Sequence, residues 1–207
     1  MKILPALLLL VAGTDVPRVT GREVVVGLPC DGCEAVFQGI PDTIPSVARI
    51  APVGEPGEPM AIRGRLTRGD GAPAPGIVIY AYHTDAKGIY PRGEGLTGMA
   101  ARHGRLRSWA RTDANGEYRF DTIRPASYPN TRIPAHVHLH VIEPGRTTYY
   151  IDELLFENDP FLTPEARRSQ VRGRGGPGAV ANPARDANGV WQSRRDIMLG
   201  AGIPGYR

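Results

Sequence analysis

The sequence predicts an all-β fold: an antiparallel β-sandwich with long irregular N- and C-terminal extensions. The 207 residues include 26 glycines and 20 prolines, and this density disfavours long helices and favours short strands joined by turns. From residue 60 onward, runs of β-branched, aromatic and alternating apolar residues recur at regular intervals, as they do in antiparallel sandwiches. The length suffices for one sizeable core with extensions.

Residues 1–20 are expected to be a signal peptide. Lys2 precedes an apolar run over residues 4–13, which has the length of a signal-peptide core and is too short to span a bilayer. A secreted or periplasmic location would follow. If the run is a buried strand or the start is misassigned, the protein would instead be cytoplasmic. No membrane-spanning segment is predicted elsewhere in the chain.

The next predicted region is an irregular arm, residues 21–59, rich in proline, glycine and glutamate. It carries Cys30 and Cys33, a Cys-x-x-Cys pair without the second pair that a zinc ribbon needs. No βαβ pattern follows, which argues against a thioredoxin-like site. In an exported protein the pair is expected to form a local disulfide.

Residues 60–207 are expected to form the β-sandwich domain. Asn115-Gly116 closes a predicted hairpin turn, because this dipeptide accepts the positive φ angles that tight turns require. Thr163 followed by Pro164 is the one good helix start, with a threonine cap and proline at the first helical position. The predicted strands cover residues 60–66, 76–82, 106–112, 117–123, 136–141, 147–151 and 190–199.

The segment over residues 136–141 alternates histidine with aliphatic residues. On a strand, residues two apart point to the same face, so His136, His138 and His140 project together while the aliphatic residues enter a core. Neutral imidazole is the commonest nitrogen ligand for metals, and two histidines on one face could grip a single ion. The alternative is a polar strand face turned to water.

Two tyrosines could complete such a metal site. Tyr90 and Tyr128 each end a loop that borders a predicted strand, and each precedes a proline. A phenol, with a pKa of about 10, is a poor ligand unless the metal is a strong Lewis acid such as ferric iron. Two phenolates and two imidazoles would leave ferric iron with one excess positive charge. Such a site would bind a catecholate dianion well.

Taken together and in this order, these motifs resemble the intradiol ring-cleavage dioxygenases, the family of the protocatechuate and catechol dioxygenases. The resemblance runs from about residue 62 to residue 160, roughly half of the chain. The ordered set is specific, although each fragment alone is a weak signal. The segments that carry it are residues 82–90, 111–120, 123–129, 134–138 and 156–160.

The resemblance implies an Fe(III) cofactor held by Tyr90, Tyr128, His136 and His138. Tyr128 would leave the metal when substrate binds and would take a proton from the incoming catechol, acting as ligand and base in turn. The enzyme would cleave a catechol-type aromatic diol with O₂, inserted between the two hydroxylated carbons, to give a muconate-type dicarboxylate. Its partners would be a small catechol-like substrate and O₂.

Several features depart from the family pattern. An arginine usually lies three residues before the first histidine, where this chain has Ile133. Arg132, one residue earlier, is the candidate catalytic replacement, although neighbouring residues on a strand face opposite ways. Glu153 replaces a polar residue, often glutamine, and its carboxylate would discourage an anionic substrate. The loop over residues 128–136 is also shorter, and the leader and the arm have no counterpart in the cytoplasmic enzymes.

Two other functions stay open from the sequence. His83 and Asp85 form a His-x-Asp pair which, with a distant histidine, could make an Fe(II) site of two histidines and one carboxylate. Alternatively, the protein is a secreted, non-catalytic module that binds a metal. Of the remaining histidines, His140 could support the metal ligands from the same strand face, whereas His103 is expected to be solvated in a basic loop.

The charge pattern argues against nucleic acid as a partner. The formal net charge is only +4, and no basic stripe is interleaved with aromatic residues. Because glycine- and proline-rich arms often wrap around a partner chain, a homodimer is a further hypothesis. The candidate pocket residues are Tyr80, Tyr82, Trp109 and Ile133.

Overall fold

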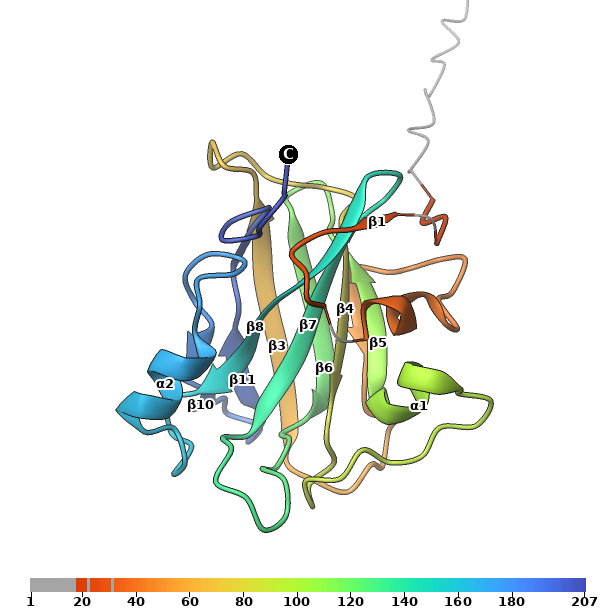
Figure 1. Ribbon diagram of the computed structural model, residues 1–207. Helices are drawn as coiled ribbons and strands as arrows, with labels where there is room; N and C mark the ends of the chain where they lie inside the picture. The colour runs from red at the N-terminus through yellow and green to blue at the C-terminus, as the bar shows by residue number, and fades with distance from the viewer. Residues whose placement is uncertain (1–17, 22, 31) are drawn as a thin grey trace, which may run out of the picture.

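Two β-sheets pack face to face in the computed structural model, which describes residues 18–21, 23–30 and 32–207 (Figure 1). The expected signal peptide therefore lies largely outside the described residues. Within the described ranges, no helix is long and apolar enough to cross a membrane. The prediction of an all-β fold is confirmed, because strands dominate and the helices are few and short.

Sheet A carries the histidine strand near its middle, in the strand order β1-β8-β7-β4-β5, with β9 beside β8. Within the run β8-β7-β4-β5, each adjacent pair of strands is antiparallel, as predicted. The strands of this sheet are β1 (Val24–Val25), β4 (Val78–His83), β5 (Arg107–Arg111), β7 (His136–Glu143), β8 (Thr147–Phe156) and β9 (Val180–Ala181).

Sheet B has the strand order β10-β11-β3-β6-β2, with β12 beside β3. Its centre is the long antiparallel pair of β3 and β6. The hairpin turn that was predicted before β6 is present, and Gly116 has a φ of 76° there. The strands are β2 (Val47–Arg49), β3 (Pro59–Thr67), β6 (Glu117–Ile123), β10 (Ala184–Arg185), β11 (Trp191–Arg194) and β12 (Ile197–Met198).

The two ends of the chain are less irregular than expected, because both add short strands to the sheets. The arm supplies β1 and β2, and the C-terminal region supplies β9 to β12. Most of these strands pair in parallel: β1 and β9 with β8, β11 and β12 with β3, and β2 with β6. The sheets are therefore mixed. Alternation along one strand sets which face is buried, but it carries no information about a neighbour's direction.

Three short helices complete the described fold: the 3₁₀ helix η1 (Cys33–Phe37), α1 (Gly98–His103) and α2 (Pro164–Gln170). The predicted start of α2 is confirmed, because the side chain of Thr163 accepts a hydrogen bond from the backbone N–H of Ala166 at 3.1 Å. Helix α1 was not predicted from the sequence. It begins after Thr97 and ends at Gly104, two residue types that commonly mark helix boundaries.

The main core lies between the sheets. Val137, Leu139 and Val141 of β7 are buried in it, so the alternation predicted for this strand is confirmed. The opposite face of sheet A is also buried, because the arm folds over it (Figure 1). There Trp109 of β5 donates its indole N–H to the carbonyl of Val36 in η1 at 2.8 Å. Sheet A therefore has two covered faces, and the histidines point toward the arm.

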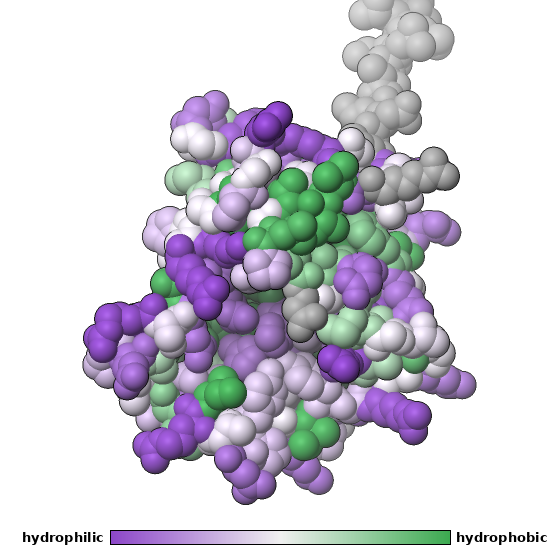
Figure 2. Space-filling view, in the orientation of Figure 1, coloured by the Kyte–Doolittle hydropathy of each residue, from purple (hydrophilic) through white to green (hydrophobic). Residues whose placement is uncertain are grey.

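Figure 2 shows apolar surface over β1. Val24 of this strand and Leu28 beyond its end are 65% and 67% exposed. The homodimer hypothesis stays a prediction.

Candidate active site

Two loops carry the predicted tyrosine ligands, one after β4 and the other between β6 and β7. Asp85 orders the first loop, because its Oδ1 accepts hydrogen bonds from the amides of residues 87 and 89 at 2.8 and 2.9 Å. The N–H of Ala126 in the second loop donates to the backbone carbonyl of Asp85 at 3.1 Å. The loops that carry Tyr90 and Tyr128 are thus joined directly through their backbones.

Gly88 allows these loops to meet. Its φ is +78°, a conformation that residues with a side chain rarely adopt. A Cβ atom at this position would lie 2.8 Å from the carbonyl carbon of Ser127 and closer still to its oxygen. Because Ser127 immediately precedes Tyr128, the close approach of Gly88 sets the spacing between the two tyrosine loops.

The functional groups of four side chains converge on one point. The Oη of Tyr128 lies 2.7 Å from the Oη of Tyr90 and 3.0 Å from the Nε2 of His136. The Nε2 of His138 lies 2.8 Å from the Oη of Tyr90, 3.5 Å from the Oη of Tyr128 and 3.1 Å from the Nε2 of His136. The structure therefore brings together the four residues that the sequence analysis named as metal ligands.

The far sides of the two imidazoles are also bound. The Nδ1 of His136 lies 2.7 Å from the carbonyl oxygen of Pro134, so it carries the proton of the neutral ring and donates it. The Nδ1 of His138 faces a carboxylate oxygen of Glu153 at 3.5 Å. Metal-ligating histidines commonly donate their second ring nitrogen to a carbonyl or a carboxylate in this way, which fixes the ring and its tautomer. Both Nε2 atoms are thereby left facing the centre of the site.

Burial sets the protonation of the site. It lowers the pKa of His136 to about 4, so this imidazole is neutral at neutral pH and its lone pair is free. Burial also raises the pKa of Tyr90 and of Tyr128, so these phenols ionise at neutral pH only beside a positive charge. Burial raises the pKa of Glu153 as well, but the hydrogen bond with His138 outweighs it, and that pKa is lowered to about 2.

This donor set fits ferric iron. The Nε2 lone pairs of His136 and His138 face each other at 3.1 Å, an arrangement that is repulsive unless a cation lies between them. The two phenols beside them are buried and need a positive charge to ionise. A trivalent cation would answer both needs, since it binds imidazole and stabilises phenolate.

A cavity of about 480 Å³ opens beside the four donors. Its volume falls within the range of small-molecule sites, and α1 contributes Met99, Arg102 and His103 to its wall. A larger groove of about 740 Å³ lies over sheet B, but no tyrosine or histidine lines it. The cavity is lined by Pro29, Tyr82, Tyr90, Met99, Arg102, His103, Tyr128, His138, Leu139, His140, Tyr150, Ile151 and Glu153.

Arg132 does not line this cavity. Arg132 is exposed, and its guanidinium lies over the ring of Phe161 at 5.6 Å from the ring centre. Ile133 is 41% exposed and does not line the cavity, contrary to its selection as a pocket residue. The arginine that lines the cavity is Arg102, which the sequence analysis did not single out.

Of the other candidate pocket residues, Tyr82 lines the cavity and stacks on His138 with 4.4 Å between ring centres. Tyr80 and Trp109 are buried beneath the arm and do not line it.

The structure does not support the Fe(II) alternative. His83 is fully buried; its Nδ1 donates to the carbonyl of Thr84 and its Nε2 accepts from the hydroxyl of Thr122, both at 2.6 Å. Burial lowers the pKa of His83 to about 4. Asp85 uses its carboxylate to bind loop amides. The pair is therefore structural, because neither side chain is directed at a common metal position.

His103 is not solvated, contrary to expectation. It is 3% exposed, stacks on Tyr82 with 3.7 Å between ring centres, and shares a hydrogen bond of 2.8 Å between its Nδ1 and the hydroxyl of Tyr80. The basic composition of its segment suggested a solvated loop, but α1 turns this side chain inward under the arm.

Comparisons with known proteins agree with this geometry. The family model described as Dioxygenase matches residues 45–175, more than half of the chain. Catechol 1,2-dioxygenase 2 of Acinetobacter lwoffii is 28% identical over 194 residues, covering 73% of this chain and 69% of that protein. The protocatechuate 3,4-dioxygenase beta chain of Burkholderia cepacia is 29% identical over 144 residues, covering 58% of this chain and 58% of that protein.

The fold has solved counterparts as well. One is the dioxygenase domain of a dioxygenase and carbohydrate-binding protein fusion from Streptomyces sp. SirexAA-E. It is 24% identical with a TM-score of 0.55, and the match covers 77% of this chain and 90% of that domain. With the match of the family model, these findings show that the chain belongs to the intradiol ring-cleavage dioxygenase family.

Proposed function

We propose that this protein binds Fe(III) through Tyr90, Tyr128, His136 and His138, and that it cleaves a catechol-type diol with O₂ to a muconate-type dicarboxylate. The observation that carries the proposal is the convergence of two buried phenol oxygens and two imidazole nitrogens beside a cavity. The names of the related catechol and protocatechuate dioxygenases support the substrate class.

Ferric iron, when bound, supplies the Lewis acidity that binds the diol as a catecholate and activates it toward O₂. The residues of the chain hold the metal and handle protons. His136 and His138 are kept in place from behind by Pro134 and Glu153, so their Nε2 atoms stay directed at the site. Burial raises the pKa of Tyr128, so its phenolate would be a strong base.

Tyr128 is the base in this proposal. Its Oη lies 2.7 Å from the Oη of Tyr90, 3.0 Å from the Nε2 of His136 and 3.5 Å from the Nε2 of His138. A diol that enters the cavity therefore meets the Oη of Tyr128 beside the position it must occupy. Tyr128 would accept a proton at Oη from one hydroxyl of the diol. Tyr90, held by the Asp85 loop, stays as the permanent oxygen ligand.

Arg102 supplies the positive charge that Ile133 does not provide at the usual family position. It lines the same cavity as Tyr90 and Tyr128, whereas Arg132 lies outside it. A cation in the wall favours an anionic catecholate and the negative charge that grows during ring cleavage. Glu153 lies in the same wall and opposes substrates that carry a further carboxylate, which favours simple, uncharged catechols.

A location in an oxidising compartment belongs to the same proposal. The disulfide between Cys30 and Cys33 supports it, because disulfides persist in exported proteins and are rare in the cytoplasm.

The test is ring cleavage of a simple catechol under isotopically labelled O₂ by the iron-loaded protein. The expected product is a muconate-type dicarboxylate with both labelled oxygen atoms, one on each of the two carbons that carried hydroxyl groups. Tyr128→Phe should reduce the rate sharply while its folding is unchanged by circular dichroism. Iron binding without oxygen uptake on any of several catechols would contradict the proposal and favour a non-catalytic metal-binding module.

A further inference from the structure

His140 is the third histidine of β7, and the metal site described above does not use it. It is 2% exposed, and neither of its ring nitrogens has a hydrogen-bond partner among the residues that the structure describes. A buried polar group without a partner is costly, so its place in the core calls for an explanation.

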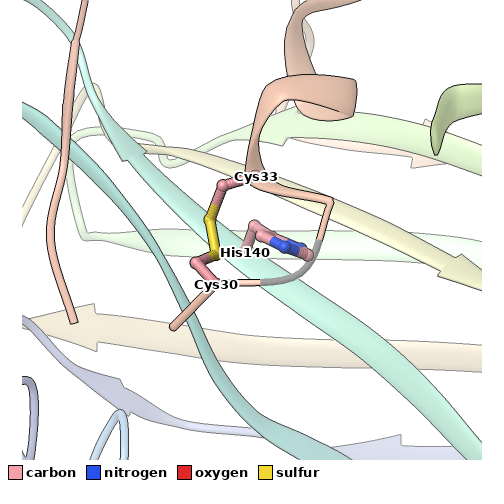
Figure 3. Close-up of side chains that lie close together, drawn as sticks. All are labelled: Cys30, Cys33 and His140. Atoms are coloured by element: carbon pink, nitrogen blue, oxygen red, sulfur yellow. A yellow bond between two sulfur atoms is a disulfide. The ribbon is translucent and has the colours of Figure 1, made fainter. Parts of the chain in front are cut away.

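The cysteine pair of the arm lies directly against this ring (Figure 3). Cys30 and Cys33 form a disulfide, and a sulfur of each cysteine and a ring nitrogen of His140 all lie within 4.8 Å of one another. Gly32, which precedes Cys33, lies close to His103: its φ is +80°, and a Cβ there would lie 2.6 Å from the Nε2 of His103. The arm thus places two sulfurs beside an imidazole that has no hydrogen-bond partner among the described residues.

We propose that, when the disulfide is reduced, Cys30, Cys33 and His140 bind a zinc ion. A tetrahedral zinc site places its ligand atoms roughly 3.7 Å apart. The two sulfurs, about 2.05 Å apart in a disulfide, must therefore separate by roughly 1.7 Å on reduction, and both start within 4.8 Å of the ring nitrogen. A fourth position faces the cavity of about 480 Å³, which His140 and Pro29 both line, and water can fill it.

The charge of the site favours zinc over other soft metals. Two thiolates and one neutral imidazole around Zn²⁺ make a complex without net charge, whereas Cu⁺ would leave one negative charge. The rings around His140 are uncharged aromatic groups, including Tyr80, Tyr82 and Tyr150. A neutral complex is therefore the least costly to bury in this setting. Thiolates also disfavour hard Fe(III), so β7 would present two sites with different metal preferences.

A dithiol reductant converts the disulfide form of the protein into the dithiol form that binds zinc. The disulfide accepts two electrons and two protons from the dithiol, which becomes a disulfide in turn. The two new thiols of Cys30 and Cys33 release their protons as Zn²⁺ binds. Oxidation reverses both steps and ejects the metal, so the zinc form belongs to a reducing compartment and the disulfide form to an oxidising one.

The experiment uses Co²⁺ as a coloured substitute for zinc on the full chain. The protein is reduced with a dithiol, freed of it without air, and titrated with Co²⁺. A thiolate-to-cobalt charge-transfer band that saturates at one equivalent is expected, and zinc should displace the cobalt. The band reports sulfur ligation, so cobalt bound by the tyrosine and histidine donors would not produce it. If the proposed Fe(III) site proved wrong, the result of this titration would be unchanged.

Variants and reoxidation complete the test. Cys33→Ser should abolish the band, and His140→Phe, which keeps the buried volume, should weaken binding by about tenfold or more, since losing even a supporting residue commonly costs that much. Reoxidation of the wild-type protein should release one equivalent of metal, a measurement that needs no variant. A reduced wild-type protein without the band, or His140→Phe with unchanged affinity, would overturn the proposal and leave the disulfide as a brace for the arm.

Discussion

Replacing Gly88 with alanine should force apart the two loops that carry Tyr90 and Tyr128. The added Cβ would lie 2.8 Å from the carbonyl carbon of Ser127, whereas carbon atoms in contact are about 3.5–4.0 Å apart. The loops must therefore separate by about 1 Å. A misplacement of that size in an active site can lower the rate by about 100-fold, so we expect a loss of that order in kcat/KM.

A matched control separates this clash from backbone strain. Gly76 has the same φ of +78°, but a Cβ there meets nothing within 4 Å. Gly76→Ala should therefore lose only the roughly 1–2 kcal/mol of a left-handed alanine. Gly88→Ala should lose about 1–3 kcal/mol more from overpacking.

Urea unfolding measures the two stabilities, and oxygen uptake with catechol measures the two activities. Gly76→Ala should keep its activity, because Gly76 lies before β4 and the site lies after it. Equal stability and equal activity in the two variants would refute the argument that Gly88 sets the spacing of the tyrosines.

The remaining predictions concern charge, protonation and colour. Arg102→Gln should lower kcat/KM for catechol by roughly 10- to 100-fold, the effect of losing a hydrogen bond to a charged group. Arg132→Gln should leave oxygen-uptake kinetics unchanged. The reverse result would restore Arg132 as the replacement for the family arginine. Burial lowers the pKa of His83 to about 4. Between about pH 6.5 and pH 4 the unfolded chain therefore binds a proton at this residue that the folded chain does not. As the pH falls through this range, the free energy of unfolding decreases by about 1.4 kcal/mol per pH unit. His83→Gln should remove that part of the slope in denaturant titrations of the iron-free protein, and an unchanged slope would show that His83 is not held neutral. Tyr90→Phe should lose the iron or its visible colour, while Tyr150→Phe, a cavity tyrosine outside the donor group, should keep both.

Local pattern predicted the parts of the structure that depend on single strands. The alternation over residues 136–141 was enough to place three histidines on one face of β7 and Val137, Leu139 and Val141 in the core. The prolines after Tyr90 and Tyr128 did not mark the ends of these loops, which continue to α1 and to β7. The hairpin turn before β6 was predicted from Asn115-Gly116. These features depend on backbone periodicity and turn chemistry, which nearby residues determine.

The features that the sequence did not predict depend on docking between distant segments. His103 and Arg102 occupy the cavity region only because α1 packs under the arm, and no local pattern records that contact. The arm itself read as irregular, yet its strands add to both sheets and its disulfide meets His140. Arg132 was selected for its position beside Ile133, but its guanidinium finds an aromatic partner in Phe161 outside the cavity.

The visible absorption spectrum of the purified, iron-loaded protein tests the central claim most directly. Tyrosinate bound to Fe(III) gives a broad charge-transfer band in the visible region, and a catecholate that displaces Tyr128 should move this band to longer wavelength. We predict a coloured protein whose spectrum shifts when catechol is added, with the colour lost in Tyr90→Phe. A protein that stays colourless when iron is supplied would contradict the ferric site of two tyrosines and two histidines.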